Sequence, residues 1–116
     1  MAYDEKLAER VRALLSAHPA VTERKMFGGI AFMVGGSMCC GVVGDDLMVR
    51  TGPDKYAEAL SRPHARPMDF TGRPMKGMLY VGALGCRSDS DLKQWVRTGA
   101  EFAASLPSKK GTKERG

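Results

Sequence analysis

Between residues 25 and 51, short apolar segments alternate with glycine-rich breaks, and this alternation constrains the fold more than any other feature of the chain. The breaks are Gly35-Gly36-Ser37 and Gly44-Asp45-Asp46, and residues of these types tolerate the tight turns that join neighbouring strands. The pattern predicts a three-stranded antiparallel meander over residues 25–34, 38–43 and 47–51. Two glycines inside the first segment, Gly28 and Gly29, predict a bulge or bend there.

An amphipathic helical pattern precedes the meander. Residues 3–17 place apolar side chains on one helical face and charged side chains elsewhere. The apolar side chains are Leu7, Val11, Leu14 and Leu15. Pro19 ends this helix, because the residue before a proline is pushed out of the helical region.

After the meander, the sequence predicts a short helix, two strands and a long final helix. Pro53 suits the first position of a helix that runs to about Leu60. The proline-rich residues 62–67 are expected to form a loop, and strands are expected at residues 67–70 and 77–81. Ser88 and the acidic residues after it open the final helix. Its inward stripe is expected to consist of Leu92, Trp95, Val96, Phe102 and Leu106.

The expected order is therefore helix, three strands, helix, two strands, helix. Helices placed at the start, middle and end of an antiparallel sheet normally cover one of its faces. The sequence thus predicts a two-layer α+β domain over residues 1–106. Residues 107–116 contain no apolar anchor and are expected to form a disordered basic tail.

Positive charge is concentrated in two short stretches. The net charge is +5, and the tail supplies +3 of it through Lys109, Lys110, Lys113 and Arg115 against Glu114. A second excess of +3 lies at residues 62–76, where Arg62, Arg66, Arg73 and Lys76 stand against Asp69. These four side chains are candidate contacts for phosphates or for an acidic protein. The alternative is a solvated loop whose arginines pair with Asp69 and neighbouring carboxylates.

Methionines are frequent in or beside the expected strands. They are Met33, Met38, Met48, Met68, Met75 and Met78. Flexible thioethers on an uncovered sheet face can form an adaptable surface for a partner, a ligand or a second copy of the chain. The alternative is that these methionines only fill gaps in the core. A homodimer through the sheet face is the hypothesis that follows from the first interpretation.

The sequence contains neither of the metal-binding patterns CxxC and HExxH. Adjacent Cys39 and Cys40 are expected to project to opposite faces of a strand, so that they cannot readily share one ion. His64 could in principle approach Cys39, Cys40 or Cys86, but a free cysteine usually packs as a small apolar group. The glycines form neither a phosphate-binding loop nor a dinucleotide fingerprint. We therefore expect no enzyme activity, cofactor or metal.

The chain begins with charged residues, and no stretch approaches the roughly 18 apolar residues that a membrane helix needs. Its three cysteines are an odd number and two of them are neighbours, which is atypical of a disulfide framework. Both features predict a cytoplasmic protein.

Three segments carry a family resemblance. They are Arg24-Lys25-Met26-Phe27-Gly28-Gly29, Leu47-Met48-Val49-Arg50 and the run from Met68 to Met78 that contains Gly72-Arg73-Pro74. In combination they make the chain similar to the TfoX N-terminal domain family from the first helix to about Phe102. The resemblance implies a helix-sheet domain of secretion-chaperone-like topology. After the last helix only ten residues remain, whereas two-domain members carry a further helical domain, so a stand-alone domain is expected.

The resemblance also implies a link to the TfoX/Sxy proteins, cytoplasmic bacterial coregulators of competence genes that work beside a DNA-bound activator. It supplies no catalytic residues. The leading hypothesis is therefore a non-catalytic regulatory adaptor that binds another protein, such as a transcription factor on DNA. Two alternatives stay open: direct nucleic-acid binding through a local basic surface, and a small-ligand or chaperone-like binding module.

Overall fold

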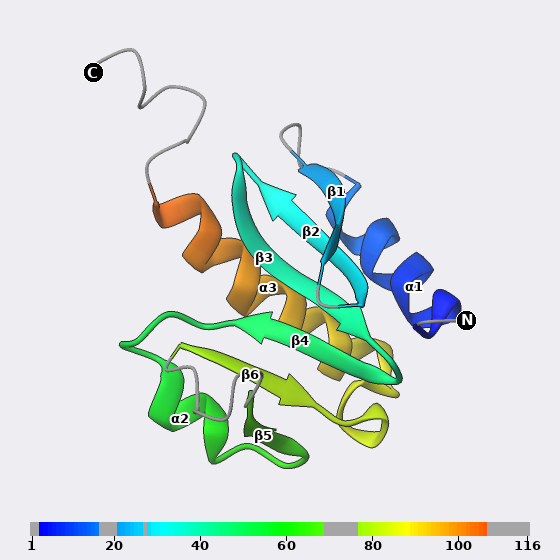
Figure 1. Cartoon of the computed structure of the whole chain (residues 1–116). Coiled ribbons are helices and arrows are strands. Elements are labelled where there is room, and N and C mark those ends of the chain that lie inside the picture. Colours follow the sequence, from blue (N-terminus) through cyan, green and yellow to red (C-terminus); the bar gives the residue numbers. More distant parts are fainter. Residues whose placement is uncertain (1–2, 17–20, 27, 69–76, 107–116) are drawn as a thin grey trace.

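The computed structural model describes residues 3–16, 21–26, 28–68 and 77–106. In this part of the chain, a six-stranded antiparallel sheet carries two helices on one face, and a third short helix lies near one end of the sheet (Figure 1). The expected α+β class and the antiparallel sheet are confirmed. The sheet order is β1-β2-β3-β4-β6-β5.

The meander has four strands instead of the expected three. They are β1 (Val21–Met26), β2 (Gly29–Val34), β3 (Ser37–Val43) and β4 (Asp46–Arg50). Gly28 has a positive φ of 76° and lies in the turn between β1 and β2, where Met26 pairs with Gly29. The two glycines that suggested a bulge inside one strand therefore reverse the chain, because only glycine adopts this backbone conformation at little cost.

The second half of the sheet also differs in detail from the prediction. Helix α2 (Tyr56–Leu60) begins three residues after Pro53, and β5 (Ala65–Pro67) lies in the segment that was expected to be a loop. β6 (Met78–Val81) inserts between β4 and β5. Pro67 is tolerated because β5 is an edge strand with one unpaired side. Residues 69 and 70, expected to be strand, lie outside the described residues.

Helices α1 (Glu5–Leu15) and α3 (Asp89–Ser105) begin with capping side chains. Asp4 Oδ1 accepts a hydrogen bond from the Leu7 amide, and Ser88 Oγ accepts one from the Asp91 amide, both at 3.1 Å. These bonds satisfy amide groups that the first helical turn leaves free. A 3-10 helix, η1 (Ala83–Cys86), leads from β6 into α3.

The main core lies between the helices and the sheet. From the sheet it contains Ile30, Phe32, Val34, Cys40, Val42, Leu47, Val49, Leu79 and Val81, and from the helices Leu7, Val11, Leu15, Leu92, Trp95 and Val96. Ala100 and Ala103 complete the stripe of α3, whereas Phe102 and Leu106, which were expected in it, are only half-buried. Small residues occupy these helical positions because α3 runs close to the sheet.

A bulge in the β2–β3 pairing overturns one prediction about the cysteines. Phe32 pairs with Cys40 and Met33 pairs with Met38, so Cys39 is an extra residue in β3. Cys39 and Cys40 therefore do not project to opposite faces: both belong to the main core, and their sulfur atoms lie 3.6 Å apart. Strict alternation holds only where strands pair without interruption.

The opposite face of the sheet holds a second apolar cluster. It consists of Ala31, Met33, Met38, Met48 and Met68, with Val43, Met78 and Tyr80 packed against it. The four methionines in the centre are at most 7% exposed. They thus pack as core residues, as the alternative interpretation of the sequence proposed. Pairing of this face with a second copy stays a prediction, and Met75 lies outside the described residues.

Among the described residues, no helix is both long enough and apolar enough to cross a membrane.

Candidate apolar groove between two helices

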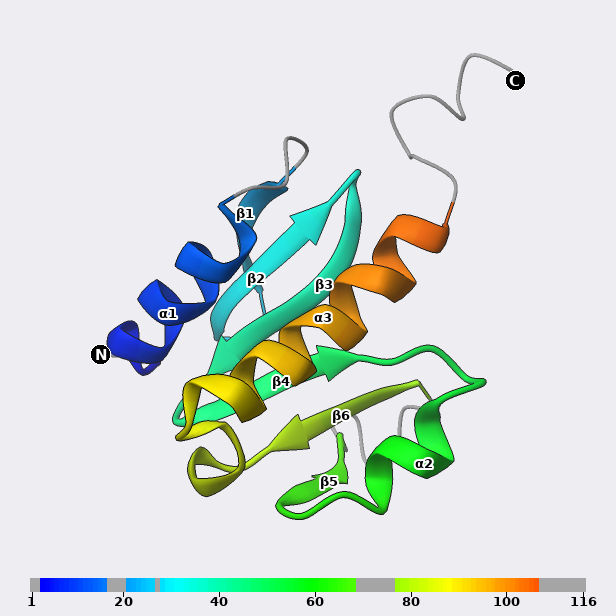
Figure 2. The same cartoon turned by 180° about the vertical axis from the view of Figure 1, so that it is seen from behind.

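Helices α1 and α3 lie side by side on the sheet and run in the same direction (Figure 2). Side chains of both helices line a groove between them. A hollow of about 290 Å³ occupies the part of the groove near the carboxyl ends of both helices. Its apolar lining consists of Leu14, Leu15, Val96, Ala100 and Ala104. Because the alanine side chains on this stretch of α3 are short, the two helices leave a gap that their own side chains do not fill.

A second hollow extends the groove toward the amino ends of the helices. Its volume is about 590 Å³, and its lining includes Arg10, Ala13, Ser90 and Leu92. Leu14 and Lys93 line both hollows, so the two adjoin along α1 and α3, and we call them together the groove. Leu14 is half-buried although it belongs to the apolar stripe of α1. The groove therefore has an apolar floor that solvent reaches.

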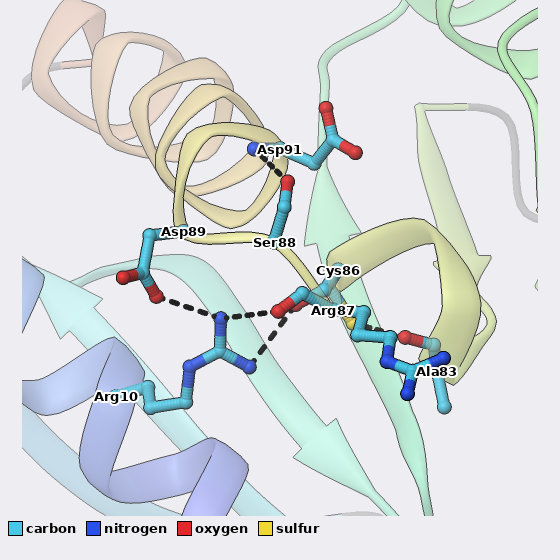
Figure 3. Close-up of polar contacts among 7 residues, drawn as sticks. All are labelled: Arg10, Ala83, Cys86, Arg87, Ser88, Asp89 and Asp91. Carbon is cyan, nitrogen blue, oxygen red and sulfur yellow. Dashed lines mark hydrogen bonds and ion pairs between the residues drawn. The ribbon is translucent and has the colours of Figure 1, made fainter.

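Arg10 closes one end of the groove by linking α1 to the start of α3 (Figure 3). Its guanidinium donates to the carbonyl oxygen atoms of Cys86 at 3.1 Å and Arg87 at 3.0 Å, and to Asp89 Oδ1 at 3.0 Å. Five donors in a planar fork suit this arrangement, in which three acceptors converge on one side chain. The network fixes the spacing of the two helices at this end.

Charged residues along the groove leave two cations without an acidic partner. Asp89 pairs with Arg10, and Glu101 lies 3.7 Å from Lys55. Lys93 and Arg97 form no ion pair with any other residue of the described ranges. Both are exposed and lie one turn apart on α3, beside the apolar floor. The free charge at this groove is therefore positive.

The candidate contact residues Arg62 and Arg66 do not line this groove. Arg62 stacks on the Trp95 ring, 3.8 Å from its centroid, and donates to Gln94 Oε1 at 2.9 Å. Arg66 forms an ion pair with Asp46 and lies 5.2 Å from the centroid of the Tyr80 ring. Both side chains thus have intramolecular partners. The other two candidates, Arg73 and Lys76, lie outside the described residues.

The residues of the family motif have structural roles where the structure describes them. Gly28 supplies the left-handed turn between β1 and β2. A Cβ atom on Gly29 would overlap the Val42 carbonyl group, so this position requires a glycine for close packing of the backbone. Met26 ends β1. Phe27, Gly72, Arg73 and Pro74 lie outside the described residues.

Cys40 and Cys86 lack the setting of an activated nucleophile. Contact with the Cys39 thiol, together with burial, raises the pKa of the Cys40 thiol well above its usual value. Burial also raises the pKa of the Cys86 thiol. Catalytic cysteines need the opposite shift. In the ranges that the structure describes, no three His, Cys, Asp or Glu side chains gather as metal ligands, and every buried side-chain nitrogen or oxygen has a hydrogen-bond partner.

Fold and site together define a class: a small α+β domain whose antiparallel sheet carries two helices on one face, with an apolar groove between them. The family model of the TfoX N-terminal domain matches residues 13–103. The chain therefore belongs to the TfoX N-terminal domain family, as its motifs suggested. Comparisons with curated proteins and with solved structures gave no match.

Sequence reasoning did not find the groove, although one signal for it was present. Leu14 and Leu15 are consecutive, and only one of two neighbouring helical side chains can point straight at the sheet. The other must lie at the edge of the buried stripe, where α3 leaves it half-buried. On the facing helix, Ala100 and Ala104 have short side chains that leave space beside Leu14.

Proposed function

We propose that this domain is a non-catalytic regulatory adaptor that binds another protein through the groove between α1 and α3. The observation that carries the proposal is the apolar floor of the hollow near the carboxyl ends of the helices, together with Leu14, which also lines the adjoining hollow. An apolar hollow that solvent reaches and that charged side chains border is a feature of protein docking sites. A regulatory role agrees with the resemblance to the TfoX/Sxy coregulators of transcription.

Two further observations favour binding over catalysis. The lining of the groove near the carboxyl ends of the helices offers charged groups at its rim but no cluster of polar groups in its floor. The pKa values of the Cys40 and Cys86 thiols are shifted upward, away from those of nucleophiles. A closed pocket for a small ligand would bury most of its occupant, whereas this groove is open along its length.

The test compares one groove variant with a matched leucine variant elsewhere. Leu14→Ser removes apolar floor from the groove, whereas Leu84→Ser changes a leucine that is 62% exposed and outside the groove. Tagged wild-type protein and both variants are used to capture proteins from an extract of the source cells, with bound proteins identified by mass spectrometry. Thermal unfolding of each sample controls for folding.

We expect proteins retained by wild type and by Leu84→Ser to be lost from Leu14→Ser. Identical sets of captured proteins for all three samples, with all three folded, would remove the groove from consideration as the docking site.

A further inference from the structure

We infer that the partner segment that fits this groove is an amphipathic α-helix with an acidic flank. The inference rests on the proposed function and specifies the chemistry of the partner. Three features of the groove carry it: the apolar floor, the two free cations on α3, and walls that consist of helices.

The walls of the groove favour a helix over an extended segment. Backbone amide and carbonyl groups of α1 and α3 are bonded within their own helices, so the groove offers side chains and no unpaired strand edge. An extended segment buried there would leave its own backbone groups without partners, which is costly. A helix satisfies its backbone internally and needs only an apolar stripe to match the floor.

The length of the groove sets the length of the occupant. The lining of the groove runs from Arg10 to Leu15 on α1 and from Asp89 to Ala104 on α3, so its longer wall spans about 24 Å at 1.5 Å per residue. A helix of about four turns would lie along it, with two or three apolar anchors spaced three and four residues apart. Such an anchor set matches Leu14, Val96 and Ala100, which lie along the same floor.

The positive charges beside the floor favour a partner helix with acidic side chains along one flank. Lys93 and Arg97 stand one turn apart beside the floor and have no acidic partner in the described part of the chain, whereas Asp89 and Glu101 are already paired. Carboxylates on the partner would complete two ion pairs. The tail of this chain is a poor occupant, because residues 107–116 carry four cations and one acid, a balance of +3.

The experiment uses two synthetic helical peptides of 14 residues, labelled with fluorescein, and the full-length protein. Both peptides carry leucine at positions spaced three and four apart. One has glutamate beside this stripe, and the other has lysine at the same positions. Affinities are measured by fluorescence anisotropy at physiological salt for wild type, for the double variant Lys93→Glu/Arg97→Glu, and for the control Arg24→Glu/Lys25→Glu.

The control changes the net charge by the same amount on β1, away from the groove. We expect wild type and the control to bind the glutamate peptide about tenfold more tightly than the lysine peptide, as two exposed ion pairs allow. The double variant Lys93→Glu/Arg97→Glu is expected to invert this preference. Leu14→Ser is expected to weaken binding of the glutamate peptide.

Equal affinity for the two peptides, or an equal effect of the two charge reversals, would overturn the acidic-helix inference. If wild type prefers the lysine peptide and Leu14→Ser weakens its binding, the acidic partner is overturned but the groove remains a docking site. Absence of binding by both peptides would also overturn the inference, while the capture comparison of Leu14→Ser with Leu84→Ser judges the proposed function separately.

Discussion

Arg10 is the residue whose loss should disturb the groove most directly. One guanidinium bonds two backbone carbonyl groups and a carboxylate that belong to the junction between η1 and α3. Lysine offers a charge at this position but no fork that reaches three acceptors. The forked shape of the Arg10 guanidinium, as much as its charge, therefore links α1 to the junction between η1 and α3.

Arg10→Ala is expected to lower the free energy of unfolding by about 1–2 kcal/mol, because the carbonyl groups of Cys86 and Arg87 lose their donor. Arg10→Lys should recover only part of this loss. Urea unfolding followed by the fluorescence of Trp95, the single tryptophan, measures the effect. Arg97→Ala, at a site without an ion pair to any described residue, is the control and should change stability by less than about 0.5 kcal/mol.

The buried thiols give a second prediction at this scale. Because Cys39 and Cys40 are fully buried and the pKa of Cys40 is raised, a thiol reagent at pH 7 is expected to modify the folded protein far more slowly than the protein in guanidinium. A raised pKa stabilises the folded state below the ordinary thiol pKa of about 8.5, and this contribution is lost as the pH rises further. Rapid modification of one cysteine at pH 7 would contradict the packing described for it.

Helix α3 packs closely against β3. A Cβ atom on Gly99 would overlap the carbonyl oxygen of Cys39 and lie 3.3 Å from its sulfur. Cys39 is the extra residue of the bulge, so the irregularity in β3 and the glycine in α3 occupy the same contact. The position of the helix on the sheet thus depends on a residue without a side chain.

Gly99→Ala is expected to destabilise the protein by about 1–3 kcal/mol, although alanine is the better helix former, because backbone atoms of β3 cannot move aside cheaply. Lys93→Ala on the exposed side of the same helix should leave the unfolding midpoint nearly unchanged. Both are compared by thermal unfolding. A Gly99→Ala protein as stable as wild type would show that α3 can shift on the sheet.

An ion pair links α1 to the edge strand β1. Arg12 donates twice to the Glu23 carboxylate, at 2.6 and 3.0 Å, and this bonding lowers the pKa of Glu23 below its ordinary value. The pair is solvent-exposed, and exposed pairs contribute at most about 1 kcal/mol. It therefore supports the position of the edge strand without determining it.

Glu23→Gln is expected to cost less than about 1 kcal/mol at pH 7. A lowered pKa contributes stability above the ordinary carboxylate pKa, and the contribution disappears as the pH falls through the lower value of the folded state. The difference between variant and wild type should accordingly shrink from pH 6 toward pH 3 in a series of urea titrations. A difference that stays constant across this range would contradict the assignment to the ion pair.

For the whole molecule, the open question from the sequence is direct binding of nucleic acid. Two of the four residues proposed for phosphate contact have intramolecular partners: Arg62 stacks on Trp95, and Arg66 pairs with Asp46. Of the net charge of +5, the tail supplies +3. The described surface at Arg62 and Arg66 thus offers little free charge.

We expect weak, salt-sensitive binding to duplex DNA that is lost when the four cations Lys109, Lys110, Lys113 and Arg115 are replaced by glutamine. Fluorescence anisotropy over a salt series measures it, and Arg62→Ala serves as the comparison. Affinity that survives the tail substitutions and falls with Arg62→Ala would favour the direct nucleic-acid binder over the adaptor.

The local parts of this fold could be predicted from the sequence because their causes lie within a few residues. Ser88 caps the helix that follows it, Leu7 and Val11 recur at helical spacing, and the glycine-rich breaks at 35–37 and 44–46 separate strands. Together with the family motifs, these signals determined the α+β class and the family. Gly28 was recognised as special, but a single sequence does not distinguish a bulge from a chain reversal.

Tertiary structure alone decided where strands pair and where surfaces stay open. β5 is a strand because β6 offers it an edge, although Pro67 argues locally against it. Cys39 and Cys40 share one side because the pairing partners of Phe32 and Met33 skip a residue. The groove exists because Ala100 and Ala104 face Leu14 across a gap set by α1, α3 and the sheet together. Each of these depends on contacts between residues far apart in the chain, which local patterns do not encode.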